Sequence, residues 1–287
     1  MSNASSIRIR EEILKFPALP ALCRHIMAQV GDSNADFGML ALEIKHDPGM
    51  TANVLKLANS AFFGMSRKVE SLQTAVSVLG MKRLFEVVVA GTVAQPMTMR
   101  LPGYNLDADE LLRHSVWVAV ASGELAKTLH LSTPDMLFTA GLLHDIGKII
   151  LNDFVQKEWS RMEAAKMEDE AFDLIERKVL GLNHAEVGAE LLDQWHFPSE
   201  LITVLRWHHQ PDEAQDHKTL VQIVHLADIL SYSEGIGTGL DGMTYKISST
   251  AIADLKLKTK SLEQVASHTL EKMNELQKLL TGKERGD

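Results

Sequence analysis

Histidines and aspartates are concentrated in one part of the chain, inside segments that are otherwise apolar. Residues 107–232 hold nine of the twelve histidines. In LLHDIGKIIL, His144, Asp145 and Lys148 are surrounded by apolar residues, and in VHLADIL the same holds for Asp228. Because an unpaired buried carboxylate is very costly, Asp145 requires a cation, a metal ion or several hydrogen-bond donors as its partner.

The residue types in this region suit a metal centre. Imidazole nitrogen and carboxylate oxygen bind zinc, manganese, iron, cobalt and nickel. An aspartate can bridge two ions, and two ions can hold a phosphate and activate water between them. This chemistry needs an adjacent imidazole and carboxylate on one rigid helix, here His144 and Asp145, and further ligands from neighbouring helices. The candidates for the further ligands are His114, His184, His208, His209 and Asp228.

The same residues also have structural interpretations. His114 alone could be a hydrogen-bonded core histidine, and the whole set could form a degenerate site filled by hydrogen bonds. Lys148 could serve only to neutralise Asp145, and His209 could be a solvent-facing neighbour of His208. Since the set supplies enough nitrogen and oxygen ligands for one or two ions, we favour metal.

Helices must position these side chains. Between residues 107 and 129, Glu110, His114 and Trp117 follow helical spacing, so His114 lies on an apolar stripe with Glu110 one turn before it. Further apolar segments of helical length follow at 136–151, 184–195 and 199–209, and no sustained strict alternation indicates strands. We therefore predict an all-α fold in which four or five core helices each direct a His or an Asp inward.

Turn-rich text divides the chain into three parts. The segment Gln95–Asn105 separates an N-terminal helical lobe, residues 1–100, from a metal-site lobe, residues 101–235. After Tyr232 the string SEGIGTGLDG predicts a glycine-rich loop, and residues 261–280 predict an amphipathic helix. This loop and this helix make up the third part, residues 236–287.

Composition limits the classes of partner. The formal net charge of −9 argues against a global basic surface for nucleic acid. Residues 36–61 have the outline of a helix-turn-helix, but MTANVLKLANSAFFG holds one lysine and no arginine, which argues against DNA binding. The single cysteine, Cys23, fits a reducing cytosol, and no stretch approaches the roughly 18 apolar residues that span a bilayer. We expect a cytoplasmic protein without a membrane segment.

Longer strings around these residues resemble one family. The order His114, His144–Asp145, His184, His208–His209, Asp228 resembles the HD superfamily of metal-dependent phosphohydrolases. The surrounding text resembles its HDOD branch of bacterial signalling proteins over roughly residues 14–235. The matching strings are FPALPAL, HDPGMTANVLKLANSAFFG, SLQTAVSVLGMKRL, LNHAEVGAELLDQW, FPSELITVLRWHHQP and VHLADIL.

The resemblance implies a fold and a ligand set. The fold is an N-terminal helical lobe packed on an HD-like helical bundle. By analogy with metal-bound relatives, one ion is held by His114, His144, Asp145 and Asp228, and Asp145 reaches a second ion together with His184 and His208. Glu110 and His209 match positions that hold a third metal in some related HD-GYP phosphodiesterases, and Lys148 matches a lysine that contacts substrate phosphate there. As an alternative, Glu110 opens its helix, where a carboxylate favours the helix dipole.

One departure from the HD-GYP pattern bears on function. After His208–His209 the text is HHQPDEAQDHKTL, with no glycine-tyrosine-proline motif. We therefore interpret the chain as a regulatory, signal-transducing HDOD protein that holds divalent ions (iron, manganese, zinc or nickel), two in number, and binds a protein partner or a nucleotide. The alternative is an active metal-dependent phosphohydrolase or phosphodiesterase acting on a nucleotide or another phosphoester. In that case Asp145 and Lys148 would be catalytic. The sequence leaves open whether the chain is an enzyme.

Overall fold

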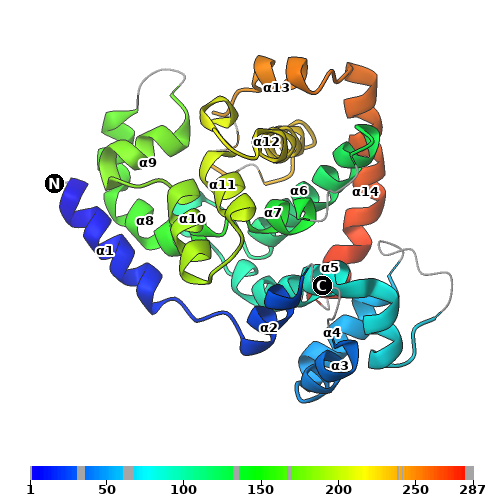
Figure 1. Cartoon of the computed structure of the whole chain (residues 1–287). Coiled ribbons are helices and arrows are strands. Elements are labelled where there is room, and N and C mark those ends of the chain that lie inside the picture. The colour runs from blue at the N-terminus through cyan, green and yellow to red at the C-terminus, as the bar shows by residue number, and fades with distance from the viewer. Residues whose placement is uncertain are drawn as a thin grey trace. The chain divides into compact units, whose positions relative to one another are not determined.

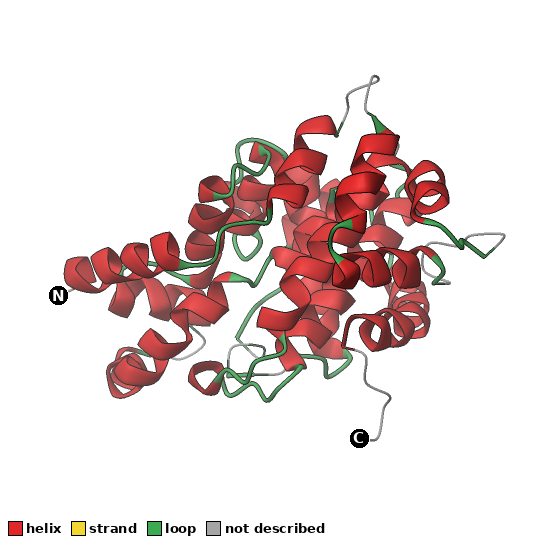
Figure 2. Ribbon diagram, turned by 90° about the horizontal axis from the view of Figure 1, so that it is seen from below, coloured by secondary structure: helices red, strands yellow, loops and turns green. Residues whose placement is uncertain are grey.

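The computed structural model describes residues 2–30, 36–60, 68–131, 136–166, 170–237, 239–240, 242 and 244–281. Over these residues the chain is helical and contains no strand, only an isolated bridge between Leu101 and Leu106 (Figure 2). The predicted all-α class is therefore confirmed. Contacts divide the chain into two compact units: Met1–Pro17 with Pro96–Thr269, and Ala18–Gln95 with Leu270–Asp287. This division does not test the domain boundaries predicted near residues 100 and 235, which stay a prediction.

The second unit contains the early helices (Figure 1). They are α2 (Ala21–Gln29), α3 (Phe37–Lys45), α4 (Pro48–Ala58) and most of α5 (Leu72–Met97), which is broken at Gly80. The Asp47 side chain accepts a hydrogen bond from Met50 N at 2.9 Å, and Pro48 follows it in the first turn. This cap ends the turn between α3 and α4, as the sequence predicts for these two helices. Ile44 and Leu57 are among their buried apolar residues.

The first unit holds the histidine-rich helices. Its elements are α1 (Ser2–Lys15), η1 (Pro102–Tyr104), α6 (Glu110–Thr128), α7 (Leu137–Leu143), α8 (Gly147–Ala165), α9 (Phe172–Leu180), α10 (His184–Gln194), α11 (Ser199–Trp207), η2 (Pro211–Glu213), α12 (Lys218–Ser233), α13 (Ser249–Asp254) and the first part of α14 (Thr259–Thr281). Helix α6 packs against α7 and α12, and α10 packs against α8 and α11. Trp117, on α6, is fully buried at the core of this unit.

Two contacts hold the N-terminal segment of this unit in place. Helix α1 docks on α10 through a two-pronged ion pair between Arg10 and Glu190, with the nearest approach 2.9 Å. Trp195 Nε1 donates to the Pro17 carbonyl at 3.2 Å. Thr238 and Asp241 of the predicted glycine-rich loop, and Met243 directly after it, lie outside the described residues. Among the described residues, no helix combines the length and the apolar character needed to cross a bilayer.

Candidate metal centre

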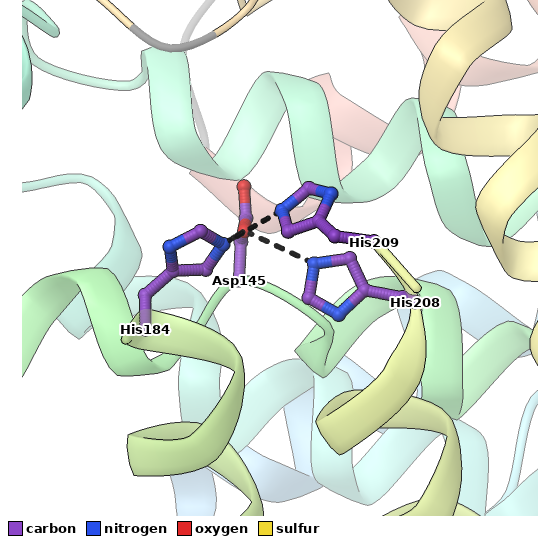
Figure 3. A group of neighbouring side chains, drawn as sticks. All are labelled: Asp145, His184, His208 and His209. Atoms are coloured by element: carbon purple, nitrogen blue, oxygen red, sulfur yellow. Dashed lines mark hydrogen bonds and ion pairs between the residues drawn. The ribbon is translucent and has the colours of Figure 1, made fainter. Parts of the chain in front are cut away.

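Six helices or their ends deliver the predicted ligands to one place. His114 comes from α6, His144 and Asp145 from the connection between α7 and α8, and His184 from the first residue of α10. His208 and His209 follow the last residue of α11, and Asp228 is on α12. Figure 3 shows the Asp145 carboxylate lying between the ring of His184 and the rings of His208 and His209. Apart from His209, the six predicted ligands are each at most 2% exposed, so the cluster is internal to its unit.

The connection that carries His144 and Asp145 differs from the sequence prediction. We expected both residues on one continuous rigid helix, but α7 ends at Leu143 and α8 begins at Gly147. Hydrogen bonds three residues apart, from Ile146 N to Leu143 O and from Lys148 N to Asp145 O, replace the α-helical pattern. The backbone stays near helical dihedral angles, which is why the apolar periodicity of the sequence runs through the break unchanged.

The imidazole rings are oriented from outside the cluster. His144 Nδ1 and His208 Nδ1 each lie 2.7 Å from a backbone carbonyl, of Gly141 and Leu205 respectively. His114 Nδ1 lies 3.1 Å from Ser231 Oγ, whose own hydrogen goes to the Asp228 carbonyl. With Nδ1 engaged outward, the Nε2 atom of each ring is left facing the interior, as in histidines that ligate metals.

The inward-facing atoms lack the hydrogen bonds that burial normally demands. Five such atoms have no hydrogen-bond partner among the described residues: Asp145 Oδ1, His208 Nε2, His209 Nδ1 and both carboxylate oxygens of Asp228. Buried polar atoms are almost always satisfied by protein or by water. The contacts that Asp145 Oδ1 and Asp228 Oδ1 do make are ion pairs inside the cluster, 3.3 Å to His184 Nε2 and 3.1 Å to His114 Nε2. Five such atoms converging at one place fit a group that is bonded by all of them, and nitrogen and oxygen donors suit a divalent transition metal.

The ligand atoms form three overlapping groups, each within 4.8 Å: Asp145 with His184, His208 and His209; His114 with His144 and Asp145; and His144 with His208 and Asp228. This spread is close to the span of one ion whose bonds are about 2.0–2.2 Å long. Asp145 belongs to the first two groups and lies between them, with Oδ1 3.3 Å from His184 Nε2 and Oδ2 3.4 Å from His114 Nε2. Its two oxygens thus face different sets of histidines, as a bridging carboxylate must.

The carboxylates polarise the cluster strongly. Burial alone would lower the pKa of His144, but the charge of Asp145 beside it, with Asp228, raises that pKa to about 10. Burial, aided by the neighbouring His144, lowers the pKa of His208 to about 3. Despite their burial, the pKa values of Asp145 and Asp228 are held well below the ordinary range, by Lys148 and the histidines for Asp145 and by His114 and His144 for Asp228. Both carboxylates are therefore anionic, the form in which they bind metal.

The other predicted residues occupy different places. Lys148 Nζ lies 2.6 Å from Asp145 Oδ2 and is itself 2% exposed, so it neutralises that carboxylate inside the site. His209 is turned inward, not toward solvent, and its Nε2 lies 2.8 Å from His184 Nε2. Glu110 opens α6 and accepts the Asp107 backbone amide at 2.8 Å; it belongs to none of the close groups of described residues. Its assignment to a third metal stays a prediction.

Sequence reasoning missed the residues that surround the ligands. Glu176 on α9 accepts from His184 Nδ1 at 2.7 Å, and Tyr104 Oη donates to the other oxygen of Glu176. The spacing of Phe172, Glu176 and Leu180, four residues apart, places Glu176 on an apolar stripe and could have revealed it. His225 is buried and structural, with Nδ1 2.7 Å from the His208 carbonyl.

The last turn of α12 and the chain that follows it cover the cluster. The ring of Tyr232 stacks on His114, with centroids 5.5 Å apart, and a Cβ added to Gly237 would lie 2.6 Å from the same imidazole. Tyr245 stacks on His209 at 3.7 Å and 9° between the ring planes. A pocket of about 560 Å³ lies beside this stack, and His209, whose side chain is 3% exposed, is the only one of the seven ligands that lines it.

Comparisons with known proteins give the family. Solved structures share the fold: an HDOD domain protein of unknown function from Geobacter sulfurreducens matches with a TM-score of 0.69 and 24% identity, covering 97% of this chain and 93% of its own. A Shewanella amazonensis SB2B protein, named provisionally as a phosphohydrolase, matches with a TM-score of 0.71 and 24% identity over 96% and 98%.

A Marinobacter aquaeolei VT8 protein, named provisionally as a signal transduction protein, gives a TM-score of 0.72 at 19% identity, covering 98% of this chain and 66% of its own. Among curated relatives, an uncharacterized protein of Treponema pallidum is 26% identical over 77% of this chain, and Ribonuclease Y of Thermus thermophilus is 32% identical over 42%. The chain spans only 43% and 16% of these two relatives. The family model of the HDOD domain matches residues 16–211, and the chain therefore belongs to the HDOD family.

Proposed function

We propose that this protein is a signal-transducing HDOD module that holds two divalent metal ions in its His/Asp cluster and responds to a protein partner or a nucleotide. The observation that carries the proposal is the set of five buried, inward-facing atoms without hydrogen-bond partners among the described residues. One ion would be held by His114, His144, Asp145 and Asp228, and the other by Asp145, His184 and His208 with His209.

Closure of the cluster favours regulation over turnover. A phosphoester must bring its phosphorus to the ions, yet Gly237 and Tyr232 lie against His114, and Tyr245 covers His209. Among the described residues the ligand side chains are at most 3% exposed and only His209 lines a pocket, so in this conformation a phosphoester has no direct approach to the other ligands. Ions enclosed in this way stabilise the arrangement of the surrounding helices, because metal affinity adds directly to folding free energy.

Metal content tests the proposal. Protein purified without chelators, and protein reconstituted with manganese, iron or zinc, is expected to hold two ions per chain by elemental analysis. Asp145→Ala is expected to lower the content at both positions, because its two oxygens face both sets of histidines. The absence of metal after reconstitution, or a content that Asp145→Ala leaves unchanged, would refute the metal centre.

A second candidate function is a metal-dependent phosphohydrolase or phosphodiesterase. Lys148 favours it, because a buried ammonium within 2.6 Å of the central carboxylate is also suited to a phosphate oxygen. The names of the Shewanella protein and of Ribonuclease Y point to the same chemistry in relatives. When bound, two ions would supply water activation and charge stabilisation at phosphorus. The chain itself would contribute Lys148, which would exchange Asp145 for the substrate phosphate.

Turnover separates the two functions. Metal-replete protein is incubated with cyclic dinucleotides, nucleotides and bis(p-nitrophenyl) phosphate, beside Lys148→Met and Asp145→Asn. Hydrolysis that both variants abolish would establish the enzyme and overturn the purely regulatory role. Metal-replete protein that binds a nucleotide, seen as a higher melting temperature, without hydrolysing it would support the regulatory role.

A further inference from the structure

Helix α9 carries a carboxylate that lies behind the metal ligands, on the side away from the cluster. Glu176 is fully buried, and it lies eight residues before His184, across the turn from α9 to α10. Gly181, in the left-handed conformation at φ 87°, ends α9, and an Asn183 capping box begins α10. This short connection brings the side chain of Glu176 directly against His184.

Two of the three hydrogen bonds that Glu176 makes with described residues go to His184. Its Oε2 accepts from the His184 backbone amide at 2.9 Å and lies 2.7 Å from His184 Nδ1. Its Oε1 accepts from the hydroxyl of Tyr104, which is also fully buried. The ring of Tyr104 meets the ring of His184 edge-on, with centroids 6.4 Å apart and 89° between their planes. Three contacts thus fix the position and the rotation of this one imidazole.

The partner of His184 differs in kind from those of the other ligands. The Nδ1 atoms of His144 and His208 face neutral backbone carbonyls, and that of His114 faces a serine hydroxyl. A carboxylate behind an imidazole makes the opposite nitrogen a better electron donor and fixes which nitrogen carries the hydrogen. Among the ligand histidines, all of them in the described part of the chain, only His184 has a carboxylate within hydrogen-bonding distance of its Nδ1; the carboxylate nearest to His209 Nδ1 is Asp228, at 3.6 Å.

We propose that Glu176, held in place by Tyr104, is a positioning residue that fixes His184 as an Nε2 ligand. It would thereby raise the affinity for one ion only, the one bound by Asp145, His184, His208 and His209. This inference rests on the proposed metal centre. It predicts that the two ions differ in affinity, and that the difference depends on a residue that touches neither ion. Loss of such a carboxylate lowers metal affinity by roughly 10–100-fold in comparable sites.

The test uses the full-length protein and Co²⁺ as the probe. Metal-free wild type, Glu176→Ala and Glu176→Gln are titrated with Co²⁺ and followed by calorimetry and by the visible absorption of the bound ion. Glu176→Ala is expected to lower the Co²⁺ affinity of one position about 10–100-fold and to leave the affinity of the other position unchanged. Glu176→Gln, which can still accept from Nδ1, is expected to lose less.

A matched control lies one turn earlier on the same helix. Asp173 is also a buried carboxylate, 1% exposed, but it accepts from the side chains of Asn183 and Gln210 and not from a histidine. Asp173→Asn is therefore expected to retain both Co²⁺ affinities. If Glu176→Ala binds both ions as wild type does, or weakens both equally, the positioning role is refuted.

A readout without metal keeps the two proposals distinct. Nitrogen NMR of the metal-free protein is expected to show the His184 ring with its hydrogen on Nδ1 in wild type and distributed over both nitrogens in Glu176→Ala. Tyr104→Phe, which removes one hydroxyl only, serves if Glu176→Ala does not fold, and is expected to weaken the same ion by a smaller factor. A wild type that binds no Co²⁺ defeats the metal centre, whereas an unchanged His184 spectrum in the variants defeats the role of Glu176.

Discussion

Gly147 lets two helices of the site approach each other closely. It opens α8 directly after the His144–Asp145 turn, and a Cβ at this position would lie 2.0 Å from the His184 carbonyl oxygen and 2.7 Å from Gly188 N. Ordinary contacts of a Cβ begin at 3.4 Å, and both clashing atoms are backbone. Gly147→Ala must therefore move α8 and α10 apart by roughly 1 Å or more.

The size of the effect follows from this displacement. Overpacking a close contact costs about 1–3 kcal/mol, and each kcal/mol lowers the melting temperature of a domain of this size by about 2–4 °C. The same displacement acts on the metal centre, because Asp145 Oδ1 and His184 Nε2 face each other across these helices at 3.3 Å. Metal bonds near 2.1 Å tolerate only about 0.2 Å of error, so the ion between them is expected to be lost.

Gly123→Ala supplies the control. Gly123 is inside α6, and an added Cβ there meets nothing within 4 Å. Replacing a helical glycine with alanine in open space stabilises by about 0.5–1 kcal/mol. Thermal melts of both variants, with and without Co²⁺, and their metal contents are compared with wild type. The reasoning is refuted if Gly147→Ala melts as high as Gly123→Ala and holds as much metal.

Three further changes probe the ligands, their cover and their charge. Asp145→Ala should lower the metal content at both positions, whereas His209→Ala is expected to lower it at one position only, because His209 belongs to one of the close groups. Elemental analysis of both variants measures the difference. Tyr245→Ala removes the ring stacked on His209 and should speed extraction of metal by EDTA, with little change in affinity at equilibrium. Unfolding of metal-free protein in urea should show a stability maximum near pH 6.5. Below this pH, stability falls because the unfolded chain takes up a proton at His208, whose folded pKa is lowered to about 3. Above it, stability falls because the unfolded chain releases a proton from His144, whose folded pKa is raised to about 10. Bound metal requires neutral His144, so the metal-loaded protein should not lose stability as the pH rises above 6.5.

The sequence predicted which His and Asp side chains face the interior because polar residues are conspicuous in apolar helices. Asp145 and Asp228 interrupt apolar helices, and a carboxylate in such a place has to be compensated. Helical spacing then predicted that His114 faces the interior, where it is 2% exposed. These inferences depend only on residue type and period, so the sequence contains them fully.

The surrounding contacts were beyond the same reasoning. Nothing in the period distinguishes a continuous helix from the turn at His144–Asp145, because the dihedral angles hardly change there. Tyr104 lies in the short 3-10 element η1, which is too short to show a periodicity, so its contact with Glu176 depends on how distant segments pack. The position of Tyr245 over His209 likewise results from the path of a loop, for which sequence patterns indicate turns but not directions.

Charge balance links the metal proposal to the choice between regulation and turnover. Two divalent ions would bring four positive charges, and Lys148 adds a fifth, whereas the carboxylates of Asp145, Asp228 and the buried Glu176 bring three negative charges. A buried excess of positive charge is costly, so a fully loaded centre favours an additional anion, such as hydroxide or a phosphate group. Because Gly237 and Tyr245 close the cluster, a larger anion enters only if this cover moves. Under the proposed function, metal loading and anion binding would therefore be coupled to displacement of Gly237 and Tyr245, and a nucleotide that is bound without being hydrolysed would be a signal in its own right.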